Sequence, residues 1–227
     1  MGNVDKNVYS KIPDWKVPLT KKGLSQARKV GKELYEKIHE ICNWEKNIII
    51  YSSPWYRARQ TAKCIRDKFE KDKNFVWKYG TVQYKEDPRL REQEWANYME
   101  EKNKEKIKRE RHKFGTFFYR MPEGESGADV YDRVSSFFDT LFRDFEKEYF
   151  PENVIIVSHG LTIKMFLMKW FHWTVEELEK IETPDNCEIV HLRRPMDETK
   201  FQLITELKDK EKSEYIDHIN DYNKLFK

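Results

Sequence analysis

Two short apolar runs constrain the fold of this chain most, because each leads at once into polar residues and then into a helix pattern. Residues 47–51 read NIIIY and residues 153–157 read NVIIV. Apolar runs without polar alternation are typical of strands buried on both faces, and such strands belong to parallel sheets. The sequence therefore predicts an α/β fold of three layers, in which helices cover both faces of a mostly parallel sheet.

Other elements are expected around these two strands. Apolar residues recur every three or four positions after Thr20, after Pro54 and after Ala128, and this spacing predicts three amphipathic helices. A further helix is expected directly after the second apolar run, at 161–171. Weaker strand patterns lie at 82–84, 187–192 and 201–207. Strands and helices thus alternate, which favours parallel pairing.

The length of 227 residues and a hydrophobic content of 38% suit one domain with a sizeable core. We expect this domain over residues 1–207, with a charged lid insertion at about 93–126 and a polar tail at 208–227. Charged residues make up 37% of the chain, but 43 basic and 40 acidic residues leave a net charge of only +3. Such mixed charge is typical of a solvated surface rather than of a nucleic-acid partner.

Cysteine content and hydropathy restrict the setting of the protein. The three cysteines are widely spaced and form neither a disulfide framework nor a zinc-ligand pattern. No stretch approaches the roughly 20 apolar residues that a membrane span needs. We therefore expect a cytoplasmic protein without a metal, a cofactor, a membrane partner or a nucleic-acid partner. The sequence does not decide its oligomeric state.

Polar residues follow both apolar strands. Ser52 and Ser53 come after the first strand, and Ser158 and His159 come after the second. Because the carboxyl ends of parallel strands meet at one edge of a sheet, these residues are expected to face the same crevice. Helix N-termini there favour anions, and the guanidinium of Arg57, in the first helical turn, matches phosphate oxygens. The pattern predicts a phosphate site.

Each of these residues also has a purely structural interpretation. His159 would be a core histidine or a cap, because helix starts recruit polar side chains for their orphan N–H groups. Arg57 and Arg59 oppose the helix dipole by about 0.3–1 kcal/mol, a cost that a bound anion would offset. Glu92 lies in a loop of mixed charge that alone indicates no chemistry. The charged run at 99–113 is interpreted as a solvated helical face, because it lacks the aromatic series of a nucleic-acid surface.

Four sequence blocks, taken in order, resemble the histidine phosphatase superfamily of phosphoglycerate mutase-like proteins, and most of all its plant, fungal and protist branch. The blocks are SSPWYRARQTA, PRLREQEW, MPEGESGADVYDRV and VIIVSHGLTIKMFLMKWF. The resemblance extends from Gly2 to about Leu192. It implies a phosphoglycerate mutase-like α/β/α fold and phosphoryl transfer through a phosphohistidine intermediate, with a phosphorylated small molecule as substrate.

The resemblance also implies roles for individual residues. Arg57 resembles the second phosphate-binding arginine of the family, and His159 resembles its second histidine. Glu92 resembles the proton donor, and Asn3 resembles the asparagine that contacts the phosphate. Positive groups would stabilise charge on the phosphoryl oxygens, while a carboxylic acid would protonate the leaving oxygen. Ala96 departs from the pattern, because relatives often carry glycine there.

The chain departs from the family at its start. The nucleophilic histidine of the family belongs to an Arg-His-Gly-Glu-Ser run that ends the first strand, and the resemblance places this run just upstream of Met1. We therefore expect the chain as given to lack the nucleophile, its arginine and the first strand, which would leave an apolar slot beside the strand that leads to His159.

Without the nucleophile, the chain as given is expected to be inactive, whereas the full-length form would be a phosphatase that acts on small phosphate monoesters. Two alternatives remain open. One is phosphoglycerate mutase activity in the same pocket, and the other is a noncatalytic pseudoenzyme that binds a phospholigand.

Overall fold

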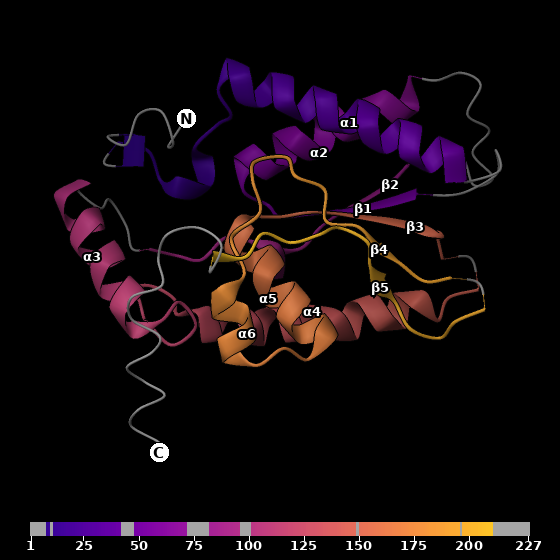
Figure 1. The fold of residues 1–227 in the computed structure, drawn as a ribbon. Helices are drawn as coiled ribbons and strands as arrows, with labels where there is room; N and C mark the ends of the chain where they lie inside the picture. Colours follow the sequence, from indigo (N-terminus) through magenta and orange to yellow (C-terminus); the bar gives the residue numbers. More distant parts are fainter. Residues whose placement is uncertain are drawn as a thin grey trace.

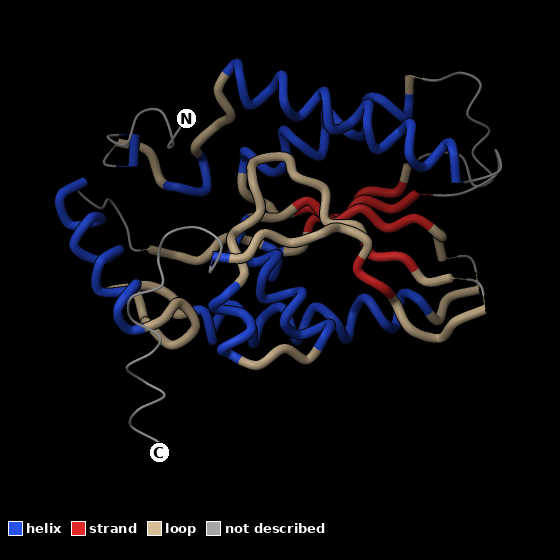
Figure 2. Tube along the Cα trace, in the orientation of Figure 1, coloured by secondary structure: helices blue, strands red, loops and turns tan. Residues whose placement is uncertain are grey.

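The computed structural model describes residues 8–9, 11–41, 48–71, 82–95, 101–148, 150–195 and 197–210, without the side chains of 101–104. These residues form three layers, with the sheet between two groups of helices (Figure 1). In Figure 2 the strands, drawn in red, gather in the middle of the molecule. The expected three-layer α/β arrangement is confirmed.

The central sheet contains three parallel strands in the order β2-β1-β3. They are β1 (Ile48–Ser52), β2 (Gln83–Glu86) and β3 (Asn153–Val157). Ile50 of the middle strand lies opposite Tyr84 on one side and Ile155 on the other. The two apolar runs of the sequence are therefore direct neighbours, and every residue of β1 is buried.

Helices α1 (Lys21–Ile41) and α2 (Tyr56–Glu70) cover one face of this sheet. Ile48 and Ile50 of β1 point toward them, because alternate residues of a strand face opposite sides. The core on this face is completed by apolar side chains that recur along the two helices. It includes Val30, Ala58, Ala62, Ile65 and Phe69.

The opposite face is covered by α4 (Gly127–Phe145) and α5 (Gly160–Phe171), with α6 (Val175–Lys180) beside them. Ile49 and Tyr51 of β1 point into this second core. A capping box starts α4, since Ser126 Oγ accepts a hydrogen bond from Asp129 N–H and the Asp129 side chain accepts one from Ser126 N–H. None of the described helices is both long and apolar enough to cross a membrane.

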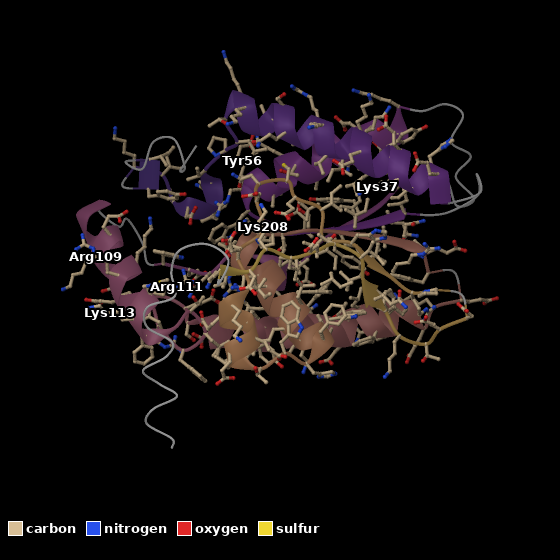
Figure 3. The ribbon with its side chains drawn as sticks, in the orientation of Figure 1. Lys37, Tyr56, Arg109, Arg111, Lys113 and Lys208 are labelled. Carbon is tan, nitrogen blue, oxygen red and sulfur yellow. The ribbon has the colours of Figure 1, made fainter. Side chains whose placement is uncertain are left out.

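Helix α3 (Glu101–Phe114) lies to one side of the three layers, at the left of Figure 1. Figure 3 shows Arg109 and Lys113 on its outer side and Arg111 on the side that faces the rest of the molecule. Arg109 and Lys113 are exposed, whereas Arg111 is half-buried. Most of the described side chains at 105–113 are thus exposed, as expected for a solvated helical face, and Ile107 is the buried one among them.

The end of the chain differs from the prediction. The strand expected at 187–192 is wrong in extent, because only Leu192–Arg193 (β4) is extended and pairs with Gln202–Leu203 (β5). Cys187 adopts a φ of 62°, and this left-handed turn interrupts an extended backbone. The sequence prediction also omitted α6, although Thr174 and Glu177 form a capping box at its start.

A large cavity runs along β3. Strand β3 pairs with β1 through one edge, and no strand among the described residues pairs with its other edge. The cavity has a volume of about 1540 Å³ and is lined by residues 153–160, by side chains of α5 such as Phe166 and Trp170, and by residues 183–192.

Candidate functional site

The candidate site lies where β1 and β3 end. Ser53 N–H donates to Val157 O over 2.9 Å, so the pairing of the two strands continues one step beyond β1. His159 follows β3 directly, and its Nε2 lies 2.8 Å from Ser53 Oγ. The structure thus brings together two strand ends that are about a hundred residues apart in the chain, as the sequence predicts for a parallel sheet.

His159 is almost completely buried, with 8% of its surface exposed. It occupies the N-cap position of α5, but its side chain makes no capping hydrogen bond. The capping part of the structural interpretation is therefore wrong, whereas the burial of His159 fits its other part, a core histidine. Burial is the main cause that lowers the pKa of His159 well below its ordinary value, and the positive charges of Arg57 and Arg133 lower it further. The imidazole is consequently neutral in this state.

Ser53 links His159 to the turn that precedes α2. Ser53 Oγ accepts a hydrogen bond from Trp55 N–H over 3.3 Å, and the same oxygen lies 2.8 Å from His159 Nε2. A hydroxyl oxygen accepts two hydrogen bonds and donates one, so the direction of the bond to His159 follows the tautomer of the imidazole. In either tautomer this bond orients the ring in the cavity that His159 lines.

Arg57 lies in the first turn of α2 and lines the same cavity as His159. Its Nη1 donates to Asp14 Oδ1 over 2.8 Å and to the Asp14 carbonyl oxygen over 3.0 Å. In the described part of the chain, Nε and Nη2 of Arg57 have no hydrogen-bond partner, so these donors are available to a ligand. Arg59 differs, because it is half exposed and forms an ion pair with Glu86 at 3.0 Å.

Glu92 lines this cavity as well. It follows the short 3-10 helix Pro88–Leu90, and its Oε1 accepts a hydrogen bond from Gln93 N–H over 3.0 Å. Burial raises the pKa of Glu92, while that hydrogen bond and the charges of Arg57 and Arg133 act in the opposite direction. A carboxyl group with a raised pKa suits the transfer of a proton to a leaving oxygen.

The start of α5 holds the loop that carries Glu92. Ser158 Oγ donates to the Leu90 carbonyl oxygen over 2.8 Å. Thr162 Oγ1 donates to the Arg91 carbonyl oxygen over 2.7 Å. The two donors lie on either side of His159 in the sequence, and the two acceptors are the consecutive carbonyl groups directly before Glu92, so these bonds tie the backbone before Glu92 to the segment that carries His159.

Glu125 fixes the other side of that loop, a role that the sequence prediction did not assign. Its carboxylate accepts hydrogen bonds from Arg91 Nη2 over 2.5 Å and from Arg133 Nε over 3.0 Å. Gln93 Nε2 donates to the Glu125 carbonyl oxygen over 2.8 Å. Gly124 permits this close approach, because an added Cβ would lie 2.3 Å from Glu94 O. A sequence signal for this contact existed, because Arg91 lies in the block PRLREQEW and Glu125 lies in the block MPEGESGADVYDRV.

Asp14 and Trp55 are two further residues near the site that sequence reasoning missed. Asp14 lies in the 3-10 helix Asp14–Lys16, far from α2 in the chain, so nothing in the local pattern indicated its contact with Arg57.

Asn3 and Ala96 lie outside the described residues. The described residues contain no group of three or more His, Cys, Asp or Glu side chains that would suit a metal ion.

Comparison with known proteins shows the family of this chain. The family model described as the histidine phosphatase superfamily (branch 1) matches residues 2–206. The chain belongs to the histidine phosphatase superfamily. The sequence is 40% identical over 197 residues to the phosphoglycerate mutase-like protein AT74H of Arabidopsis thaliana, a match that covers 82% of this chain and 68% of that protein. It spans 60% of the length of a second A. thaliana relative, AT74.

A fungal relative and a solved structure extend this result. The sequence is 31% identical over 269 residues to the broad-range acid phosphatase DET1 of Saccharomyces cerevisiae, which covers 83% of this chain and 80% of that protein. The structure of mycobacterial hydrolase 1 superposes with a TM-score of 0.65 at 16% identity and covers 90% of this chain and 94% of that structure. At this identity the likeness to the mycobacterial protein concerns the fold alone.

Proposed function

We propose that the protein is a phosphatase that acts on small phosphate monoesters through a phosphohistidine intermediate in its full-length form. One observation carries the proposal. Arg57 and His159 meet at the N-terminal ends of α2 and α5, and Glu92, with its raised pKa, lines the same cavity. This combination offers donors for phosphate oxygens together with an acid for the leaving group.

In the proposed reaction a histidine nitrogen attacks phosphorus while the ester P–O bond breaks. The Arg57 guanidinium and His159 stabilise the negative charge on the phosphoryl oxygens, aided by the positive ends of α2 and α5. Glu92 gives its proton to the leaving oxygen. Water then attacks phosphorus and gives a proton to the Glu92 carboxylate, the P–N bond breaks, and inorganic phosphate leaves.

The nucleophilic histidine of this scheme is proposed to lie outside residues 1–227, together with its arginine. Of the six histidines, His159 is the one that the described residues place at the carboxyl ends of the parallel strands. The cavity along the edge of β3 that no strand among the described residues covers supports this proposal, because it lies where the sequence predicts an apolar slot. Residues 1–227 alone are accordingly proposed to bind phosphate without catalysing its transfer.

The finer placement of the protein also belongs to this proposal. The relatives from A. thaliana and S. cerevisiae support the plant, fungal and protist branch of the family. DET1 is a broad-range acid phosphatase, and this relative supports phosphatase activity for the present chain. A cytoplasmic location, the absence of a cofactor and the domain boundaries at residues 1–207 remain predictions from the sequence.

Phosphoglycerate mutase activity is the second candidate, because the chain is also similar to a phosphoglycerate mutase. The chain is 25% identical over 200 residues to a 2,3-bisphosphoglycerate-dependent phosphoglycerate mutase of Gloeobacter violaceus. The two activities share the phosphohistidine step and differ in the acceptor, which is water for the phosphatase and a substrate hydroxyl for the mutase. Product analysis separates them, because only the phosphatase releases inorganic phosphate.

The proposal is tested by hydrolysis of p-nitrophenyl phosphate. Two proteins are compared, residues 1–227 and the same chain extended by the genomic segment immediately upstream of Met1. The extended chain is expected to release phosphate and to lose most of this activity when His159 is replaced by alanine, whereas residues 1–227 are expected to show none. Turnover that is absent from the extended chain, or that is indifferent to His159→Ala, would contradict the phosphatase proposal.

The same comparison of residues 1–227 with the extended chain also tests whether the protein is noncatalytic. If the genomic segment encodes no Arg-His-Gly run in frame and the extended chain binds inorganic phosphate without hydrolysing the ester, the protein is a phospholigand-binding pseudoenzyme. If residues 1–227 hydrolyse the ester unaided, the proposed position of the nucleophile is wrong.

A further inference from the structure

Trp55 contacts both residues that are proposed to hold the phosphate. It precedes the first turn of α2 and is buried, with 6% of its surface exposed. The Arg57 guanidinium carbon lies 4.5 Å from the centre of the indole ring. The imidazole of His159 packs against the same ring in a tilted, edge-type arrangement, with centroids 5.2 Å apart and an angle of 65° between the planes. A single side chain therefore links the two groups.

An indole ring suits this position better than a carboxylate would. Its face attracts a cation through the ring quadrupole, but it accepts no conventional hydrogen bond from the guanidinium or the imidazole. The Asp14 carboxylate, by comparison, accepts a hydrogen bond from Nη1 of Arg57 and so occupies that donor. The ring holds Arg57 without occupying its remaining N–H donors, which stay available to phosphate oxygens.

The backbone of Trp55 contributes to the same arrangement. Its N–H donates to Ser53 Oγ over 3.3 Å, and Ser53 Oγ lies 2.8 Å from His159 Nε2. His159 is therefore held on one side through Ser53 and on another by the indole ring. Both restraints arise from the turn that leads from β1 into α2.

We propose that Trp55 is a positioning residue of the phosphate site, whose indole ring holds Arg57 and His159 in a fixed mutual arrangement while leaving the remaining N–H donors of Arg57 free for the anion. This inference rests on the proposed function, because it assumes that Arg57 and His159 bind phosphate. Trp55 itself needs no contact with the substrate. Its effect reaches the anion through the two side chains that it orients.

The test measures the binding of inorganic phosphate to residues 1–227 by isothermal titration calorimetry. Trp55→Leu is expected to weaken binding about tenfold, because it removes the aromatic face. Trp55→Phe retains an aromatic ring and is expected to stay within about threefold of the parent chain. Trp173→Phe is the matched control, since Trp173 packs against Phe171 at the opposite end of α5 and is expected to leave binding unchanged.

A double substitution separates positioning from general stabilisation. In the presence of Arg57→Gln, the further change Trp55→Leu is expected to cost less affinity than it costs in the parent chain, because one of the two groups that the ring orients is already gone. Independent, additive losses would overturn the inference. Phosphate affinity that is unchanged in a folded Trp55→Leu protein would overturn it as well.

Fluorescence keeps the inference testable if Trp55→Leu fails to fold. Phosphate is expected to change the tryptophan emission of the parent chain and of Trp173→Phe but not that of Trp55→Phe, because both contacts of the Trp55 ring respond to the anion. An equal change in Trp55→Phe would overturn the inference. If the parent chain binds no phosphate, the proposed function fails together with it, whereas binding that needs Arg57 but not Trp55 refutes only the role of Trp55.

Discussion

His159 Nε2 lies 2.8 Å from Ser53 Oγ, so the histidine that follows β3 is bonded to the serine that follows β1. The same oxygen accepts the backbone N–H of Trp55 at the start of α2. One hydroxyl group thus joins two strands and a helix at the point where Arg57 also enters the cavity. The site is built by the ends of secondary structure elements rather than by a long loop.

Ser53→Ala is expected to weaken phosphate binding. Loss of one hydrogen bond is worth about 1 kcal/mol, which corresponds to roughly a fivefold increase in the dissociation constant. Calorimetric titration with inorganic phosphate measures the change. Ser135→Ala is the matched control, because that hydroxyl bonds only to Tyr131 O within α4. Equal or tighter binding in Ser53→Ala would show that the bond does not orient His159.

The buried, neutral state of His159 predicts a pH dependence of stability. Its pKa is lower in the folded chain than the ordinary value of about 6.5 in the unfolded chain. As the pH falls below about 6.5, His159 becomes protonated in the unfolded chain while it is still neutral in the folded chain. The free energy of unfolding therefore falls by up to about 1.4 kcal/mol per pH unit, until the pH reaches the pKa of His159 in the folded chain. Above about pH 6.5, His159 is neutral in both the folded and the unfolded chain, so it makes no contribution to the pH dependence of stability.

Urea unfolding of the parent chain and of His159→Gln, between about pH 5 and pH 8, isolates this contribution. The difference in stability between the two proteins is expected to be constant at the upper end and to change toward the acid end, where only the parent chain carries the titrating imidazole. Addition of phosphate is expected to reduce the slope, because the bound anion favours the protonated form. A difference that is independent of pH would contradict the buried, neutral state.

Glu125→Gln is expected to destabilise the fold by about 3 kcal/mol, because it leaves the half-buried guanidinium groups of Arg91 and Arg133 without their shared carboxylate. Chemical denaturation measures this loss. Glu70→Gln is the control, since Glu70 forms only a surface pair with Arg66 at 3.6 Å and is expected to change stability by less than about 0.5 kcal/mol. Similar losses in the two variants would show that the Glu125 network does not stabilise the loop.

Gly160 packs too closely to tolerate a side chain. An added Cβ would lie 2.2 Å from Thr183 Cγ2, so Gly160→Ala is expected to cost about 1–3 kcal/mol of stability. Thr183→Ser removes the conflicting methyl group, and the double variant is therefore expected to recover most of the loss. Additive effects in urea unfolding would show that this contact does not set the cost.

The sequence predicted those parts of the fold that depend on how apolar residues recur along the chain. Ile48 to Tyr51 are apolar without alternation and form the buried middle strand, while Ala58, Ala62, Ile65 and Phe69 recur at helical spacing and pack beneath it. The convergence of Ser53 and His159 followed from the rule that parallel strands end at one edge. Each of these inferences needs only local pattern and topology.

Other features depend on contacts that no local pattern contains. Asp14 reaches Arg57 across 43 residues, and Glu125 reaches Arg91 across 34. The strand expected at 187–192 was wrong because Cys187 turns in the left-handed region, which a cysteine rarely adopts. The burial that shifts the pKa of Glu92 is likewise a property of packing, so the sequence indicated its role only through family resemblance.

The central claim is that Arg57 and His159 form one phosphate-binding centre, and a double-mutant cycle tests it most directly. Phosphate binding is measured by calorimetry in residues 1–227 and in the variants Arg57→Gln, His159→Gln and the combination of the two. Because both side chains are proposed to contact the same anion, the losses are expected to be non-additive, with a coupling energy of at least about 1 kcal/mol. Additive losses, or a parent chain that binds no phosphate, would contradict the account.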